Sequence, residues 1–342
     1  MTAVALSAAP STDLHPVPWR QLAWVAWRRY RLSLISTAAL LALLAVSLII
    51  SGEHLRSAYD ALRACTPTDS AKCRYLDEQF HNKYGAAGFL RPLLLLLPGI
   101  LGAFVGAPLL ARELETGTFR FAWTQGVGRM RWAVALIVPG AVGIAAIMVA
   151  FGVLVSWHQQ PLIDYGISGR LEPSTFPTVG PAVAGWTLVG FALGVLAGLL
   201  WRRVVAALAT AFALWFGLAY LGSRFRAHYL PPLRTTSLDL SSRNLFVNQW
   251  WTYHGARVGQ HEIDSKLESL GANVNGNSVS VHVGPGAVDP FQYLLSHGYQ
   301  QVTSYQPARR FWPFQWIEFG WLAVLSVILL GITFWLLRRR AA

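Results

Sequence analysis

Long apolar runs alternate with polar segments along the chain. A helix needs roughly 20 apolar residues to cross a hydrocarbon core about 30 Å thick. Six runs meet this requirement: 32–50, 89–111, 132–156, 179–201, 204–222 and 316–337. The pattern therefore predicts an all-α polytopic membrane protein with six transmembrane helices.

Only Arg202 and Arg203 separate the fourth run from the fifth. One helix over 179–222 would be about 65 Å long at 1.5 Å per residue, far more than a bilayer needs. It would also leave two arginines inside the membrane, which is costly. We therefore expect a tight turn at this pair.

The polar segment 223–315 is too long and too polar to lie in lipid, so we expect a small exposed domain of mixed α/β structure. Residues 261–270 have helical spacing and end at Gly271. Asn275-Gly276 is typical of a hairpin turn. Val279, Val281 and Val283 then alternate as in a strand.

Composition agrees with a membrane protein. The chain is 54% hydrophobic and 13% charged, whereas soluble domains carry about twice that charged fraction. Its net charge of +12 could suggest nucleic acid, but the excess lies beside the ends of the spans. We therefore predict contact with membrane lipid and no nucleic-acid partner.

The basic residues also predict the orientation, because short cytoplasmic segments are enriched in Lys and Arg. With both termini cytoplasmic, the inner segments carry a net charge of +10 and the remainder of the chain +2. The expected location is the bacterial cytoplasmic membrane. The predicted parts are a cytoplasmic segment with an interfacial helix (1–31), spans one to five (32–222), an extracellular domain (223–315), and the last span with a basic tail (316–342).

Tryptophans and arginines interleave before the first span, as Trp19, Trp24 and Trp27 do with Arg20 and Arg28. Indole rings and arginines favour the headgroup layer of a membrane. We expect a short helix along the inner interface, followed by a first span that serves as an uncleaved signal anchor.

The two cysteines, Cys65 and Cys73, both fall in the first predicted outer loop. An oxidising compartment would permit a disulfide there. A bridge is the favoured interpretation, and a pair of free thiols is the alternative.

Motifs for several kinds of chemistry are missing. A phosphate-binding loop of the form G-x-x-x-x-G-K-[ST] is absent, since no lysine in the chain follows a glycine. His254 and His261 are the nearest approach to a histidine cluster, and their spacing favours ordinary loop residues over a metal site. We expect no cofactor and no metal on this chain.

Two ionisable residues, Arg91 and Glu318, fall inside predicted spans near their outer ends. Such residues mark a substrate path or gate in many transporters. The alternative is that each side chain snorkels to the interface.

Two blocks of sequence carry a family resemblance. The first is 112–126, Arg-Glu-Leu-Glu-Thr-Gly-Thr-Phe-Arg-Phe-Ala-Trp-Thr-Gln-Gly, between the second and third spans; the second is 305–318, before the last span. With six spans and a large loop before the sixth, the chain resembles permease subunits of actinobacterial ATP-binding-cassette (ABC) exporters of the type 2 family.

This resemblance implies partners and a coupling segment. It implies a second permease, taken here as a second copy of this chain, and two separate ABC ATP-binding subunits that hold ATP and Mg. A coupling helix within 111–131 would dock on the ATP-binding subunit. The residues expected there are Arg112, Glu113, Glu115, Thr116, Gly117, Phe119, Arg120, Trp123 and Gln125.

The cargo is less well specified than the architecture. Spans rich in Leu, Phe and Trp suggest a hydrophobic or amphipathic cargo such as a drug, natural product or lipid, although lipid contact explains this composition equally well. A receptor or assembly protein whose outer domain binds a ligand is the rival hypothesis. Gly190, Gly194 and Gly198 line one helix face, as do Gly102 and Gly106, which favours close packing within the chain over a dimer interface.

Overall fold

The structure is a computed structural model that describes residues 19–68, 70–85, 90–116, 129–237, 241, 243–270, 272–275, 278–281 and 290–339. In this part of the chain six helices are long and apolar enough to cross a membrane. They are α1 (Trp19–Arg63), α3 (Leu90–Thr116), α5 (Arg129–Tyr165), α6 (Gly180–Trp201), α7 (Val204–Phe225) and α10 (Phe311–Arg339). Each predicted span overlaps one of them, so the six-helix prediction is confirmed.

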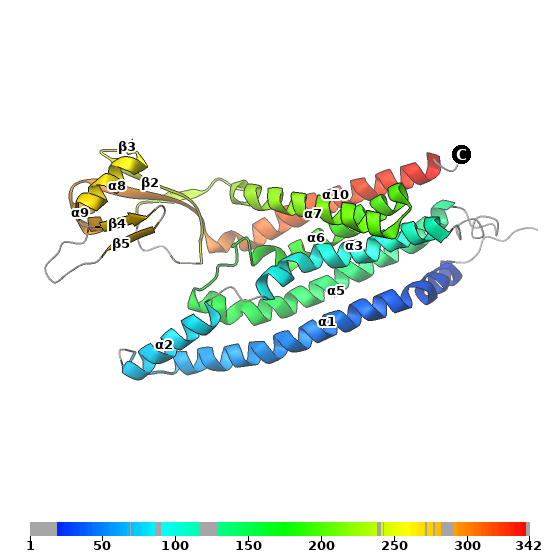
Figure 1. Ribbon diagram of the computed structural model, residues 1–342, viewed down its shortest axis with the longest axis horizontal. Helices are drawn as coiled ribbons and strands as arrows, with labels where there is room; N and C mark the ends of the chain where they lie inside the picture. The colour runs from blue at the N-terminus through cyan, green and yellow to red at the C-terminus, as the bar shows by residue number, and fades with distance from the viewer. Residues whose placement is uncertain are drawn as a thin grey trace, which may run out of the picture.

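The six helices form an elongated bundle with two different ends (Figure 1). The strands and α2 (Ala71–Tyr84) lie at one end, called here the β-domain end. The start of α1, the end of α3, the connection from α6 to α7 and the end of α10 lie at the other, called here the terminal end.

Helix α1 differs from the expectation of a separate interfacial helix before the first span. Trp19–Arg63 is one continuous helix of 45 residues, about 67 Å long at 1.5 Å per residue. No glycine or proline interrupts the chain between Trp19 and Gly52, so nothing in the backbone ends the helix there. The helix is too long for the hydrocarbon core alone, and it extends beyond it.

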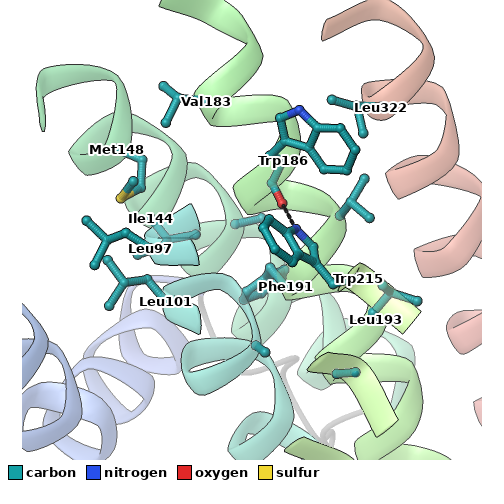
Figure 2. Close-up of a cluster of buried hydrophobic side chains, with 14 of the residues drawn as sticks. Leu97, Leu101, Ile144, Met148, Val183, Trp186, Phe191, Leu193, Trp215 and Leu322 are labelled. Atoms are coloured by element: carbon teal, nitrogen blue, oxygen red, sulfur yellow. Dashed lines mark hydrogen bonds between the residues drawn. The ribbon is translucent and has the colours of Figure 1, made fainter. Parts of the chain in front are cut away.

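Helix α6 is the centre of the bundle. Its span is 83% buried, against 17% for α1 and for α7. It packs against α3, α5, α7 and α10. Figure 2 shows the core around it, where Trp215 of α7 donates its indole N–H to the Trp186 carbonyl oxygen at 3.0 Å.

Small residues let α3 and α6 approach closely. A Cβ atom added at Gly194 would lie 2.7 Å from the Ala107 nitrogen, and one added at Gly198 would lie 2.7 Å from the Ala107 oxygen. Real Cβ atoms do not come this close to backbone atoms. The glycine faces therefore pack within the chain, as predicted.

The tight turn between α6 and α7 is confirmed. Arg202 adopts the left-handed conformation with φ 53° and ψ 21°, and its N–H donates to the Gly198 oxygen. Arg203 is extended, and α7 begins at Val204. The arginine pair is exposed at the terminal end instead of lying within one helix.

A small mixed domain, the β domain, lies between α7 and α10, as predicted. Its four-stranded antiparallel sheet has the order β1-β6-β2-β3, and β4 pairs with β5. Trp251 and Tyr299 of the sheet pack on Ile263, Leu267 and Leu294 from the two helices. The elements are β1 (Leu233–Thr235), β2 (Leu245–Tyr253), β3 (Ala256–Arg257), α8 (Gln260–Ser269), β4 (Ala272–Asn275), β5 (Ser278–Val281), α9 (Pro290–Ser296) and β6 (Tyr299–Gln306).

The β domain agrees with two local predictions. Helix α8 corresponds to the expected helix at 261–270. Strands β4 and β5 form the expected hairpin, in which Asn275 pairs with Ser278. Val283, the last residue of the predicted strand, lies outside the described residues.

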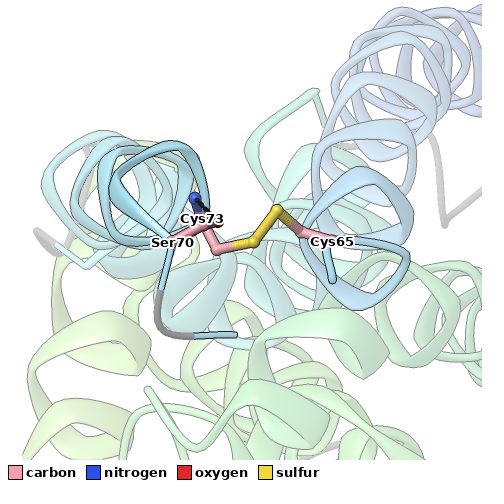
Figure 3. The surroundings of a disulfide bond; sticks show 3 residues. All are labelled: Cys65, Ser70 and Cys73. Atoms are coloured by element: carbon pink, nitrogen blue, oxygen red, sulfur yellow. Dashed lines mark hydrogen bonds between the residues drawn. A yellow bond between two sulfur atoms is a disulfide. The ribbon is translucent and has the colours of Figure 1, made fainter. Parts of the chain in front are cut away.

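A disulfide joins α1 to α2 at the β-domain end. Cys65 follows the end of α1 and is bonded to Cys73 in the first turn of α2, with the two Cα atoms 5.7 Å apart. The Ser70 hydroxyl accepts a hydrogen bond from the Cys73 N–H at 3.2 Å and so caps α2 (Figure 3). The structure thus contains the predicted bridge and not the free thiols.

Candidate functional site

A group of polar side chains lies on the face of α10 that packs against α6. Gln315 and Glu318 are both 0% exposed. The same face continues with apolar Leu322 and small Ser326. A buried carboxylate is costly unless it is paired and hydrogen-bonded, so the surroundings of Glu318 decide what this site can do.

Glu318 accepts four hydrogen bonds. Arg226 donates two of them, from Nε to Oε2 at 2.9 Å and from Nη2 to Oε1 at 2.8 Å. The Trp186 indole N–H donates to Oε1 at 2.7 Å, and the Tyr229 hydroxyl donates to Oε2 at 3.1 Å. This paired geometry is the strong form of an arginine–carboxylate interaction.

The ring of Phe176 lies against the arginine of this pair. Arg226, in the short helix η2 (Arg226–His228) after α7, is buried, and its guanidinium carbon is 4.4 Å from the centre of the Phe176 ring. Its Nη1 atom is buried without a hydrogen-bond partner among the described residues. The cation is thus held by one carboxylate and one aromatic face.

Tyr229 extends the network to a further tryptophan. Its hydroxyl oxygen accepts a hydrogen bond from the Trp321 indole N–H at 3.0 Å while donating to Glu318. Burial raises the pKa of Tyr229, and the Glu318 charge raises it further. The hydroxyl therefore stays protonated and remains a donor to Glu318. We call Trp186, Arg226, Tyr229, Glu318 and Trp321 the Glu318 cluster.

Gln315, one turn before Glu318, caps the start of α6. Its Oε1 accepts from the Ala182 N–H at 2.9 Å, and its Nε2 donates to the Phe176 oxygen at 2.9 Å. The first N–H groups of a helix have no partner within the helix, so this side chain supplies one. Gln315 and Glu318 together fix α10 to α6.

The β domain is connected to the same region. Gln306, the last residue of β6, donates from Nε2 to the Ala227 oxygen at 2.9 Å and to the Leu230 oxygen at 2.6 Å. Arg310 donates to the Pro231 oxygen and to Gln306 Oε1, each at 2.6 Å. Motion of the β domain would therefore act on the segment that carries Arg226 and Tyr229.

Comparison with known protein families identifies the family. A family model described as "ABC-2 membrane transporter related" matches residues 38–226, more than half of the 342-residue chain. The chain belongs to this family. No curated protein and no solved structure matches the chain.

An ABC-2 membrane protein of this kind is the permease component of an ABC transporter and works with an ATP-binding subunit. The match begins inside the first span at residue 38 and ends near the end of the fifth, at Arg226 of the Glu318 cluster. The six apolar helices make the ABC-2 permease a multi-pass membrane protein. The described residues contain no group of three or more His, Cys, Asp or Glu side chains that could hold a metal.

The expected coupling segment is only partly described. Arg112, Glu113, Glu115 and Thr116 form the last turn of α3. Glu113 is 2% exposed, so its carboxylate is buried in the chain and not presented to a partner, whereas Glu115 is exposed. The other expected residues, Gly117, Phe119, Arg120, Trp123 and Gln125, lie outside the described residues.

Glu318 and Arg91, the two ionisable residues predicted inside spans, have different surroundings in the structure. Glu318 does not snorkel, because it is fully buried and paired. Arg91 is the second residue of α3 and is half-buried, with Nη2 buried and without a hydrogen bond among the described residues. Within the described chain the partner of Glu318 is Arg226, and Arg91 belongs to neither this ion pair nor the hydrogen bonds of the Glu318 cluster.

Proposed function

We propose that the chain is the transmembrane subunit of an actinobacterial ABC exporter. It moves a hydrophobic or amphipathic molecule out across the cytoplasmic membrane by alternating access. Two copies of the permease work with two separate ATP-binding subunits, which hold ATP and Mg. The family match supports a permease over a receptor or assembly protein.

The orientation proposed is that the terminal end faces the cytoplasm and the β domain lies outside. The division of features between the two ends of the bundle carries this proposal. The Cys65–Cys73 disulfide lies at the β-domain end, where an oxidising compartment would permit it. The exposed Arg202-Arg203 turn lies at the terminal end, in accord with the enrichment of basic residues in cytoplasmic segments.

ATP-driven motion would enter the bundle through α3. Its last turn exposes Arg112 and Glu115, which can contact an ATP-binding subunit. Helix α3 has its largest contact with the buried helix α6, through the closely packed glycine faces. A displacement at Thr116 would therefore be passed to α6 as the movement of a rigid element.

The Glu318 cluster would hold the outer ends of α6 and α10 together with the segment after α7. Each of the four hydrogen bonds to Glu318 joins α10 to another part of the chain: one comes from Trp186 of α6, two from Arg226 of η2 and one from Tyr229, which follows η2. We propose that this cluster keeps the outer gate of the permease closed as one unit, with Arg91 at the outer end of α3 contributing to the path. Such an interface has discrete arrangements and so suits an alternating transition.

The coupling proposal is tested by co-purification. In Glu115→Lys, a charge reversal at the exposed end of α3, binding of the ATP-binding subunit should weaken by roughly tenfold or more. Transport should fall with it, while expression and membrane insertion persist. The matched control is Glu53→Lys, an exposed glutamate in the part of α1 near the β-domain end. Undiminished binding and transport in Glu115→Lys would contradict docking at this residue.

A further inference from the structure

A cavity of about 660 Å³ lies between α5, α6 and α10 at the β-domain end. This volume falls within the roughly 300–1,000 Å³ of typical small-molecule sites. Its walls are mostly apolar, and its few polar side chains are Ser156, Gln160, Arg170 and Thr175. None of these residues belongs to the Glu318 cluster, which lies on another part of the α6–α10 interface.

The cavity opens sideways from the bundle. Val153 of α5 is 65% exposed, and Trp312 and Trp316 of α10 are 55% and 59% exposed, although all three line the cavity. Exposed apolar side chains on membrane-spanning helices face lipid. A molecule in the bilayer can therefore enter the cavity without passing through the bundle.

The two tryptophans indicate the depth of the opening. Trp312 and Trp316 are one helical turn apart at the start of α10. Tryptophans are enriched at the headgroup level of a membrane. The Ala145 and Leu188 end of the cavity lies deeper along α5 and α6, towards the hydrocarbon core. The cavity is thus polar at headgroup level and apolar below it.

Arg170 is the cation at the polar end. Its Nη2 donates to Gln160 Oε1 at 2.8 Å, and its guanidinium carbon is 5.9 Å from the centre of the Phe311 ring. The Gln160 amide nitrogen donates to both carboxylate oxygens of Asp164 at 3.0 Å, so Gln160 stands between Asp164 and Arg170 in this chain of hydrogen bonds. Among the described residues no carboxylate lies within 4.0 Å of Arg170, and one Glu172 oxygen is buried without a partner instead of pairing with it.

From this geometry we infer that the cavity binds an anionic phospholipid of the surrounding bilayer. One acyl chain lies along α5 between α6 and α10, and the phosphate contacts Arg170 beside Trp312 and Trp316. An arginine with donors to spare suits a phosphate, and basic pockets between membrane helices bind anionic headgroups. This site does not depend on the proposed transport function, because it needs only the permease in a membrane.

The test uses the full-length permease in phosphatidylcholine nanodiscs. Trace phosphatidylglycerol or trace phosphatidylcholine, each with a photoreactive acyl chain, is crosslinked, and the labelled peptides are identified by mass spectrometry. Phosphatidylglycerol should label the cavity walls on α5 and α10 roughly tenfold more strongly, the effect of one hydrogen-bonded charge pair. Arg170→Gln should abolish this preference.

Two variants on one helix separate binding from general lipid contact. Val153→Trp fills the cavity from an exposed position and should reduce labelling of its walls by both lipids. Val142→Trp, at a 64% exposed position of α5 that does not line the cavity, should leave labelling unchanged. Equal labelling by the two lipids, or labelling of the walls that survives Val153→Trp, would overturn the inference.

Discussion

The Arg226–Glu318 pair gives the sharpest test of how the outer end of the bundle is held. Both side chains are buried, and Glu318 is 0% exposed. Arg226→Met leaves the carboxylate with only the Trp186 and Tyr229 donors. Removing one partner of a buried ion pair costs roughly 3–5 kcal/mol, so the free energy of unfolding should fall by about that amount.

The coupling within the pair is measured by a double-mutant cycle. Glu318→Gln removes the charge and keeps one oxygen, which can accept from Trp186 or from Tyr229 but not from both, because the two side chains donate to different carboxylate oxygens. In Arg226→Met/Glu318→Gln neither buried charge remains, so the loss should be smaller than the sum of the two single losses. The expected interaction energy is on the order of 2–3 kcal/mol, as for residues in one ion-pair network.

The assay is unfolding of the full-length permease in mixed micelles by added SDS, followed by tryptophan fluorescence. Glu262→Gln is the control, because its ion pair with Lys266 is exposed and 3.7 Å long. That pair should contribute less than about 1 kcal/mol. If the sum of the two single-mutant losses equals the double-mutant loss to within about 0.5 kcal/mol, the pair is not coupled and our account of the cluster is wrong.

Three further predictions concern packing, the disulfide and pH. Gly198→Val should cost at least 1–3 kcal/mol by overpacking the α3–α6 contact, whereas Gly331→Ala, where a new Cβ meets nothing within 4 Å, should be neutral or slightly stabilising in the same SDS titration. Cys65→Ser should cost about 2–3 kcal/mol at most, because the closed loop is short, and should speed hydrogen exchange in α2 without affecting α6; unchanged exchange in α2 would contradict this. Because the pKa of Tyr229 is raised in the folded state, the stability that its protonated hydroxyl contributes is present below the unfolded pKa and is lost as pH rises above about 10. Tyr229→Phe lacks this group and should therefore lose less stability than the wild type between neutral and alkaline pH. Equal losses in the two proteins would exclude this role.

Features that depend on the bilayer could be predicted from the sequence. Backbone groups in lipid must be satisfied within a helix, so apolar runs of sufficient length predict spans without knowledge of their packing. Helix length also requires the turn at Arg202 and Arg203. The disulfide follows from two cysteines in one short segment. These conclusions need only local sequence.

Features that depend on long-range contacts could not be predicted in this way. A carboxylate inside a span calls for a cation, but 223–315 contains several arginines, and nothing local distinguishes Arg226 from the others. Its pairing across 92 residues depends on how α7 ends against α6. The burial of Glu113 could have been predicted more easily, because this residue lies one turn beyond Leu109 and Leu110 on the same, buried face of α3.

The continuous α1 shows a different kind of error. Its interleaved tryptophans and arginines suggested an interfacial helix, but amphipathic composition does not by itself end a helix. A glycine, proline or capping residue is needed to break the path of the backbone. None lies between Trp19 and Ile50 in a position that interrupts α1.

The central claim is that this permease is driven by a separate ATP-binding subunit. The most direct measurement is to purify the tagged permease from the cells that naturally produce it, to identify any ATP-binding subunit that co-purifies, and to assay ATP hydrolysis in liposomes. The account predicts that equal numbers of the two subunits co-purify and that an amphipathic cargo stimulates hydrolysis. A folded permease that retains no ATP-binding subunit and supports no hydrolysis would contradict it.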